Sequence, residues 1–492
     1  MKCPVRMYSD DQKSADHPIG VITLLRQLIP SVHILPGRVA CGTLVVLLGL
    51  LAGPLLSAPS AAAVSSWHAL RPPSGPPFLY RTAPLFKFKY SYGNLDFGYA
   101  PGVPVLFDIS CPSVSTCYAV GKTAGNHGTI LSTTDSGAIW KMQHIPSGTG
   151  TLLSISCPSV STCYAVGSRA GNFILSRAGS HGTILSTTDS GVIWKMQKIL
   201  PATVLVPSVT CPSSKVCFAG AYTNGKSWNN NPPTTLLALT DHGTTWKVSN
   251  FPPAIMISEA MFVYPSLTTL ACASTKVCYV LGIHTARRSD GRLFFYTLFY
   301  YTNNSGVTWK IKRVPGYVGQ SIDMSCPSPN ICYALSIDGF LVRTTDSGTI
   351  WNKTGLPSHL YTYQGVHSIA CPSSSTCYAA GSTCLTSSSC GVVEKPPITS
   401  TTDSGKTWQF DGMKGVSPGT VILGISCPTV ADCYAVGANQ HGVVILSNHP
   451  TPYISPTGNI GLWLWILLGA LVALTGTVAF FRFHRRAMHH DI

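Results

Sequence analysis

The chain has 492 residues, of which 45% are hydrophobic and 10% are charged, and it contains 45 glycines, 36 prolines and 18 cysteines. Its length is about three times that of a typical single domain, which calls for internal repeats or several domains. The composition excludes a charged disordered chain and a coiled coil, and the net charge of +15 favours anionic partners.

The first element in the chain is an apolar stretch at 42–56 that follows the cation Arg38 and precedes a run of small residues at 57–63. A charge, an apolar run and then small residues are typical of an export signal. Residues 1–63 are therefore predicted to be a signal peptide or an uncleaved signal anchor. Either alternative exports the residues that follow.

The cysteines have a regular spacing, because sixteen of them form eight Cys-x5-Cys pairs spread along the chain. Zinc sites usually have shorter spacings and bring pairs together, so local disulfides in an oxidising compartment are favoured and no metal site is expected. The paired residues are Cys111 and Cys117, Cys157 and Cys163, Cys211 and Cys217, Cys272 and Cys278, Cys326 and Cys332, Cys371 and Cys377, Cys384 and Cys390, and Cys427 and Cys433.

Seven of these pairs stand in a repeated context such as SISCPSVSTCYAVG, and their first cysteines recur every 45 to 61 residues. A period of this length with β-branched and turn-rich content predicts an all-β fold, with one repeat for each blade of a β-propeller. We therefore expect a seven-bladed propeller of four-stranded blades over 64–448.

A second repeated segment, such as GTILSTTDSGAIWKMQ, predicts a strand, a tight turn and a further strand. In the turn, an Asp carboxylate can accept backbone N–H bonds, Gly can adopt a positive φ, and Trp can cover the turn. Six copies supply these three residues: Asp135, Gly137 and Trp140; Asp189, Gly191 and Trp194; Asp241, Gly243 and Trp246; Asn304, Gly306 and Trp309; Asp346, Gly348 and Trp351; and Asp403, Gly405 and Trp408.

These residues match the Asp-box of the BNR repeat family, which is found in sialidase-like propellers. The fuller pattern also resembles the photosystem II stability and assembly factor propellers, over roughly residues 64–450. The first resemblance implies that the box aspartates are turn elements, and the second implies an assembly role at membrane complexes. The paired cysteines depart from the assembly-factor pattern, and we expect them to form an outer-surface staple.

The last repeat, 427–448, has neither an Asp-box nor a closing Trp. The segment 65–75 resembles the end of a blade, with Trp67 at the position of Trp140. Residues 66–71 are therefore predicted to supply the fourth strand of the seventh blade and to close the ring, which would protect its last edge.

Insertions at 222–234, 252–266, 284–298 and 382–397 interrupt the repeats, and long loops on a rigid scaffold often carry binding function. The densest group of cations lies in or beside the fourth repeat and could hold an acidic ligand, or it could be a solvated rim. Its members are Arg287, Arg288, Arg292, Lys310, Lys312 and Arg313.

The C-terminal part begins with a Pro-rich stalk at 449–460. The uncharged stretch 461–481 is long enough to span a bilayer as a transmembrane helix, and the arginines in 482–492 predict a cytoplasmic tail. The propeller is thus expected on the extracytoplasmic side of a cell membrane.

The function predicted from these features is that of a membrane-anchored extracellular binding or scaffold module without catalysis. Its partner would be an unknown protein or an anionic glycan at the cell surface, and no nucleic acid and no cofactor are expected. The alternative is an exported sialidase-type glycoside hydrolase, which needs three arginines, a Tyr paired with a Glu and an acidic proton donor. Against it, the chain has two glutamates, Glu259 and Glu394, both in insertions, and the acids outside the boxes are scattered: Asp96, Asp108, Asp290, Asp323, Asp338, Asp411 and Asp432.

Overall fold

The computed structural model describes residues 66–73, 104–169, 181–223, 234–239, 245–249, 266–287, 293–313, 321–336, 341–354, 356, 366–381, 398–417, 420–439 and 441–449. The predicted export signal 1–63, the stalk beyond His449, the predicted transmembrane helix 461–481 and the tail 482–492 lie outside these residues. Within the described ranges, no helix is long and apolar enough to cross a membrane.

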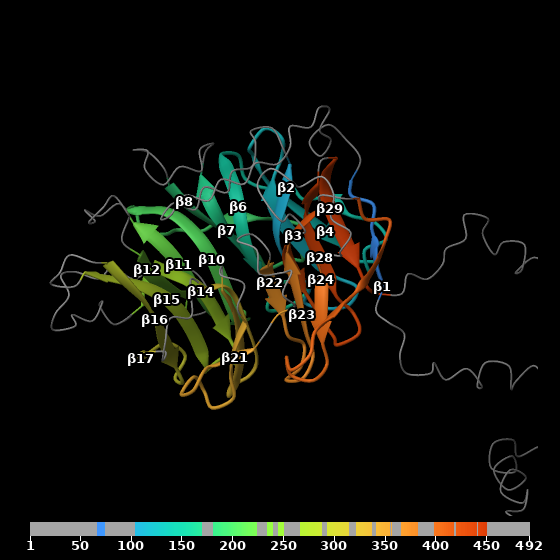
Figure 1. The fold of residues 1–492 in the computed structure, drawn as a ribbon. Coiled ribbons are helices and arrows are strands. Elements are labelled where there is room, and N and C mark those ends of the chain that lie inside the picture. Colours follow the sequence, from blue (N-terminus) through green and yellow to red (C-terminus); the bar gives the residue numbers. More distant parts are fainter. Residues whose placement is uncertain are drawn as a thin grey trace, which may run out of the picture. The chain divides into compact units, whose positions relative to one another are not determined.

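The described residues form seven sheets arranged in a ring, which is a seven-bladed β-propeller (Figure 1). Six sheets have four strands and the last has five. The strands of the first four blades are β2 Val105–Ser110, β3 Cys117–Lys122, β4 Gly128–Thr133 and β5 Lys141–Met142; β6 Thr149–Ser156, β7 Cys163–Arg169, β8 His181–Thr187 and β9 Lys195–Met196; β10 Thr203–Ser213, β11 Val216–Thr223, β12 Thr234–Leu239 and β13 Lys247–Val248; and β14 Ser266–Cys272, β15 Cys278–Arg287, β16 Leu293–Thr302 and β17 Lys310–Arg313.

The remaining blades continue the pattern. Their strands are β18 Ser321–Ser328, β19 Ile331–Ser336, β20 Leu341–Thr344 and β21 Asn352–Thr354; β22 Val366–Ala370, β23 Cys377–Gly381, β24 Ile398–Thr401 and β25 Gln409–Phe410; and β27 Val421–Ser426, β28 Tyr434–Asn439 and β29 Gly442–Ser447, joined by β1 Ser66–Ala69 and β26 Gly412–Lys414.

Burial follows the position of a strand in its blade. Every residue of β3, the second strand of its blade, is buried, because neighbouring blades cover both faces of the sheet there. Both residues of the outermost strand β5 are exposed. The sequence reflects this difference, since the second strands read as Cys-Tyr-Ala-Val-Gly and the outermost strands as Lys-Met or Lys-Val.

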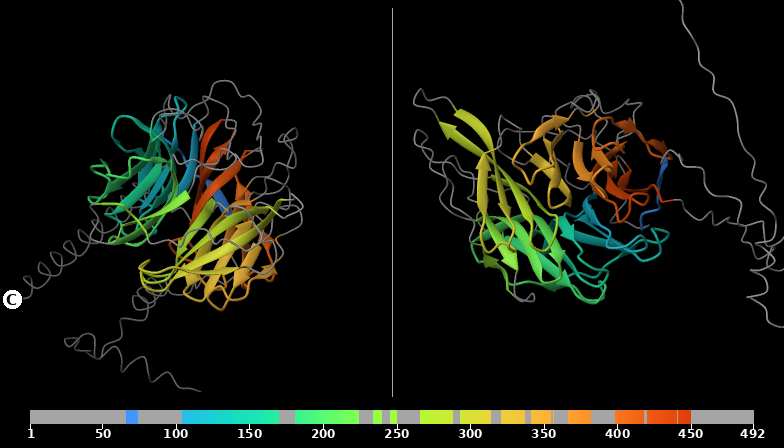
Figure 2. Two further views of the ribbon diagram at one scale, coloured as in Figure 1. Left: turned by 90° about the vertical axis from the view of Figure 1, so that its left-hand side faces the viewer. Right: turned by 90° about the horizontal axis from the view of Figure 1, so that it is seen from below.

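The ring is closed by its two ends. The innermost strands contact one another in order around the ring, and β27 of the last blade contacts β2 of the first. The segment β1 pairs antiparallel with β29, with His68 opposite Ser447, and so is the fourth strand of the seventh blade (Figure 2). This is the position that the sequence predicts for residues 66–71.

A fifth strand on the seventh blade was not predicted. The short strand β26 follows blade six in the chain and pairs in parallel with β1, with Trp67 opposite Met413. Between β25 and β26 lies Asp411, which is fully buried and accepts a hydrogen bond of 3.1 Å from the indole Nε1 of Trp67. The closing strand is therefore held on both sides.

The two ends of the blades differ in their connections. We count the strands of a blade from the innermost outward. Because they alternate in direction, the connection between the first and second strands and the one between the third and fourth lie at the same end of the ring. We call this end the stapled face; it comprises the Cys-x5-Cys connections and the Asp-box turns. Connections two-to-three and those between blades leave from the opposite end, which we call the loop face.

Candidate functional site

The Asp-box turn of the first blade is closed by a small set of hydrogen bonds. The hydroxyl of Thr133 donates to Oδ1 of Asp135 over 2.7 Å and accepts from the backbone N–H of Gly137 over 3.0 Å. The same carboxylate oxygen accepts from the backbone N–H of Ile139 over 3.0 Å. These bonds lower the pKa of Asp135, although partial burial opposes them, so the carboxylate stays charged as a turn acceptor.

The same arrangement recurs in four further boxes, those built on Asp189, Asn304, Asp346 and Asp403. In the fourth blade, Oδ1 of Asn304 accepts from Thr308 N–H over 3.0 Å, so the amide carbonyl replaces the carboxylate as acceptor. Two successive residues of each box have positive φ, such as Ser136 at 58° and Gly137 at 84°. Of the third box, Asp241 and Gly243 lie outside the described residues, whereas Trp246 is buried.

Each box is also part of a seam between two blades. A Cβ atom on Gly137 would lie 3.3 Å from the ring of Tyr434 in the preceding blade, so this glycine is required by contact as well as by its φ. Three box tryptophans pack edge-to-face on the second-strand aromatic residue of the preceding blade, as Trp194 does on Tyr118 at a centroid separation of 6.2 Å. Trp351 packs in the same way on Phe299 of the third strand β16. The boxes therefore join blades in addition to forming turns.

Seven of the cysteine pairs are disulfide-bonded, each between the innermost and second strands of one blade. The eighth pair, Cys384 and Cys390, lies outside the described residues. The expectation of an outer-surface staple is wrong: Cys111 is 7% and Cys117 is 0% exposed, and both belong to a hydrophobic cluster between blades seven and one. In this cluster the cysteines lie with Trp140 of the box and Tyr434 of the preceding blade.

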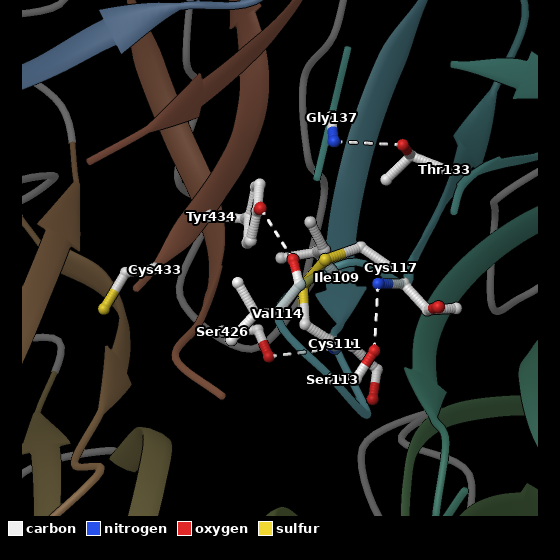
Figure 3. The surroundings of a disulfide bond; sticks show 12 residues. Ile109, Cys111, Ser113, Val114, Cys117, Thr133, Gly137, Ser426, Cys433 and Tyr434 are labelled. Atoms are coloured by element: carbon white, nitrogen blue, oxygen red, sulfur yellow. Dashed lines mark hydrogen bonds between the residues drawn. A yellow bond between two sulfur atoms is a disulfide. The ribbon is translucent and has the colours of Figure 1, made fainter. Parts of the chain in front are cut away.

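The stapled connections receive hydrogen bonds from the neighbouring blade (Figure 3). The hydroxyl of Tyr434 in blade seven donates to the carbonyl oxygen of Val114 over 2.8 Å, and Cys111 N–H donates to the hydroxyl of Ser426 over 3.1 Å. Five other tyrosines donate to the next blade in the same way: Tyr118 to Val160, Tyr164 to Ser214, Tyr279 to Pro329, Tyr333 to Ser374 and Tyr378 to Val430. The stapled face is consequently cross-linked around the ring.

Polar residues also recur on the innermost strands, three positions before the first cysteine, in six of the seven repeats, and the seventh has Gly424 there. We call these residues the axial ring: Asp108, Ser154, Ser208, Thr269, Asp323, Ser368 and Gly424. Asp108 accepts hydrogen bonds from the Ser154 hydroxyl and from Ile155 N–H of the next blade, both over 2.9 Å. Asp323 accepts the equivalent pair from Ser368 and Ile369 over 2.8 Å.

Burial is the main influence on the two axial carboxyls. It raises the pKa of Asp108 to about 7, against the hydrogen bonds from Ile155 and Ser154, and the charge of Asp323 adds to the rise. Burial likewise raises the pKa of Asp323 to about 6. These two acids are far apart in the sequence, and from spacing alone no relation between them was expected. Their shared phase relative to the cysteines is the signal that identifies them as equivalent positions in blades one and five.

His367 stands next to the axial ring. Burial lowers its pKa to about 4, so the imidazole is neutral at physiological pH, and among the described residues its Nε2 has no hydrogen-bond partner. The described ranges contain no group of three or more His, Cys, Asp or Glu that could hold a metal ion.

The predicted cationic group is divided by the β15–β16 hairpin. Arg287 ends β15 opposite Leu293, whereas Lys312 of β17 lies opposite Phe299 of β16. Leu293 and Phe299 are six residues apart on β16, which is about 20 Å at 3.4 Å per residue. Arg288 and Arg292 lie outside the described residues, Arg313 is beside Lys312, and Lys310 is exposed at the other end of β17. The hairpin thus separates Arg287 from Lys310, Lys312 and Arg313.

Most of the long connections leave from one end of the ring. The connections 70–104, 170–180, 224–233, 249–265, 355–365 and 382–397 all join strands at the loop face. The predicted insertion 284–298 is largely strand rather than loop, since 284–287 and 293–298 extend β15 and β16. On the stapled face, by contrast, every disulfide closes a connection with a sequence separation of 6.

The groups that a sialidase-type reaction would need are not assembled by the residues described. Glu259 and Glu394 both lie outside the described ranges. The axial carboxylates are engaged by donors of the adjacent blade, and the box aspartates are engaged by their own turns.

No model of a known protein family matches this sequence, and no curated protein matches it. Among solved structures, YCF48 from Cyanidioschyzon merolae is 17% identical, with 72% of this chain and 98% of that chain covered at a TM-score of 0.44. A structure of YCF48 bound to D1 peptide is 15% identical, with 72% and 95% covered at 0.44. A virginiamycin B lyase from Staphylococcus aureus is 12% identical, with 71% and 96% covered at 0.44. The similarity extends to the propeller fold and no further.

Proposed function

We propose that this chain is a membrane-tethered, extracytoplasmic propeller that binds an acidic macromolecular partner, a protein or an anionic glycan, through its loop face and without catalysis. The observation that carries the proposal is the difference between the two ends of the ring. One end is uniform, short and cross-linked, whereas the other bears the long connections, which is the arrangement of a rigid scaffold that presents variable loops.

The compartment in this proposal rests on the disulfides. Seven disulfides, one in each blade, are expected of a protein that folds in an oxidising environment. In this proposal, the export signal at 1–63 directs the chain out of the cytoplasm. The transmembrane helix at 461–481 tethers it to the membrane. An Asp-box propeller of the BNR type is the family assignment that best fits the recurrent turns.

The absence of catalysis in the proposal rests on how the acids are used. Asp108 and Asp323 accept two bonds each from the next blade, and the box carboxylates accept bonds within their turns. Groups already engaged in holding the ring together are poorly placed to transfer protons to a substrate.

The test concerns Arg287, at the loop-face end of β15, and Arg288 and Arg292, which belong to the connection 288–292 between β15 and β16. Replacing these three arginines with Ala should abolish capture of the partner from intact cells. The matched control replaces Lys312 and Arg313 of β17, which pair with Phe299 and Leu298 of β16, and should retain capture. Capture unchanged by the triple variant would reject this binding surface.

A further inference from the structure

Exposed apolar side chains gather on the stapled face. Five of them stand in Asp-box turns, within two residues before the tryptophan, and are 53% to 76% exposed: Ile139, Val192, Ile193, Val307 and Ile350. Two more, Val160 and Val430, lie in stapled connections and are 46% and 50% exposed. Single exposed apolar residues need no explanation, but recurrence at two adjacent positions of the box on one end of the ring indicates an interaction surface.

Lysines accompany these apolar residues. Lys141, Lys195, Lys247 and Lys310 each follow a box tryptophan directly and are exposed. Lys215 and Lys276 are exposed in the stapled connections of blades three and four. On the described part of this face, lysines outnumber the carboxylates, which are those of the boxes and Asp432. Exposed apolar groups interspersed with cations fit the interface of an anionic bilayer.

Both ends of the described propeller leave from the same face. The strand β1 begins and β29 ends there, and His449 contacts Asp432 of the last stapled connection. Residues 450–460 separate this point from the predicted transmembrane helix. A Pro-rich segment of this length spans at most about 35 Å at ~3.1 Å per residue. Any such helix would therefore keep the C-terminal end of the propeller, on the stapled face, within about 35 Å of the membrane.

We propose that the stapled face docks on the anionic surface of the lipid bilayer, with its Val and Ile side chains at the interface and its lysines against the headgroups. The inference rests on the membrane tether of the proposed function and adds an orientation to it. Docking at this end directs the loop face, with its hairpin and long connections, away from the membrane.

The experiment uses the full chain reconstituted into vesicles, either of phosphatidylcholine alone or of phosphatidylcholine mixed with phosphatidylserine. Amine-reactive labelling read by mass spectrometry compares Lys141, Lys195 and Lys310 with a reporter amine on the loop face. The reporter is a His127→Lys substitution in the exposed turn between β3 and β4. A lysine near an anionic surface contributes about 1 kcal/mol, which is about a fivefold preference for the position at the surface. The three lysines should therefore label about fivefold more slowly in the mixed vesicles.

The protection should disappear at about 1 M salt, where the Debye length falls to ~3 Å, and the reporter should label equally in both lipids. The variant Val192→Ser, Ile193→Ser and Val307→Ser should lose most of the protection without loss of its disulfides. If the vesicles retain the chain but the lysines label like the reporter, docking is refuted while the tether stands. If mixed vesicles do not retain the chain, both are refuted. Partner capture through the arginines of the opposite face is measured separately and is unaffected by either result.

Discussion

Closure of the ring depends on a buried hydrogen bond that a single substitution can remove. Trp67 is 0% exposed, and its indole Nε1 donates to the fully buried Asp411 over 3.1 Å. Trp140 occupies the same place in blade one at 4% exposure, but among the described residues its Nε1 has no partner. Replacing each tryptophan with Phe therefore removes the same ring volume, and only Trp67→Phe removes a hydrogen bond to a carboxylate.

Removing the donor leaves a buried acceptor without its partner, which costs about 1–3 kcal/mol. Trp67→Phe should therefore lower the free energy of unfolding by about 2 kcal/mol more than Trp140→Phe does. The assay is urea unfolding of the full chain in detergent, with disulfides intact, followed by circular dichroism. Losses that agree within about 0.5 kcal/mol would show that this bond does not hold the closing strand.

Further substitutions test the box, the axial ring and the seam. In the fourth box, Asn304→Asp should be nearly neutral, whereas Asn304→Ala should lower the free energy of unfolding by about 1 kcal/mol, as loss of a capping acceptor does, in the same urea assay. The unfolded carboxyl of Asp108 loses its proton near pH 4 but the folded one keeps it to about 7, so the unfolded state binds fewer protons across this window. Unfolding free energy should fall as pH rises from about 4 to about 7, by at most about 4 kcal/mol, and Asp108→Asn should flatten that slope; an unchanged slope would contradict the raised pKa. Gly424→Ala places a Cβ atom 2.8 Å from the Cα of Asp108, so it should lower the melting temperature by several degrees, and a tolerated substitution would show that blades seven and one are not tightly apposed.

The seams explain why the repeats keep so narrow a sequence pattern. A typical repeat supplies a tyrosine that reaches the next stapled connection, and a box whose glycine contacts the preceding aromatic residue. The disulfide lies beneath both contacts and fixes the connection that receives the tyrosine. In the chain-entropy description, each of these short loops stabilises the blade by about 2 kcal/mol.

The architecture could be predicted from the sequence because it is repeated. Seven copies of one cysteine context indicate the number of blades, and the missing box in the last copy indicates that Trp67 belongs to the seventh blade. The box hydrogen bonds could also be anticipated, including the carbonyl acceptor of Asn304, since they are local. These features depend on spacing and on the chemistry of single turns.

Features that depend on one copy were beyond the same reasoning. The strand β26 occurs once, where blade six meets the closing strand, and no repeat marks it. Asp411 stands three residues after Trp408, where other repeats have Gln143, Gln197 or Ser249, so spacing did not predict its carboxyl group. The cysteines were wrongly expected at the outer surface. Their spacing indicates which ones pair but carries no information about burial. The cations of the fourth repeat are close in sequence, but Arg287 is distant from Lys312 because a long hairpin lies between them.

The central claim is that the ring has a binding end and an opposite, cross-linked end. A photo-cross-linking residue placed at 290, between β15 and β16, or at 193, in an Asp-box turn, tests this claim in intact cells. Position 290 belongs to the connection that joins β15 and β16 at the loop-face end of these strands. The account predicts a cross-linked macromolecular partner from position 290 and none from position 193. A partner captured from position 193 alone, or equally from both positions, would contradict it.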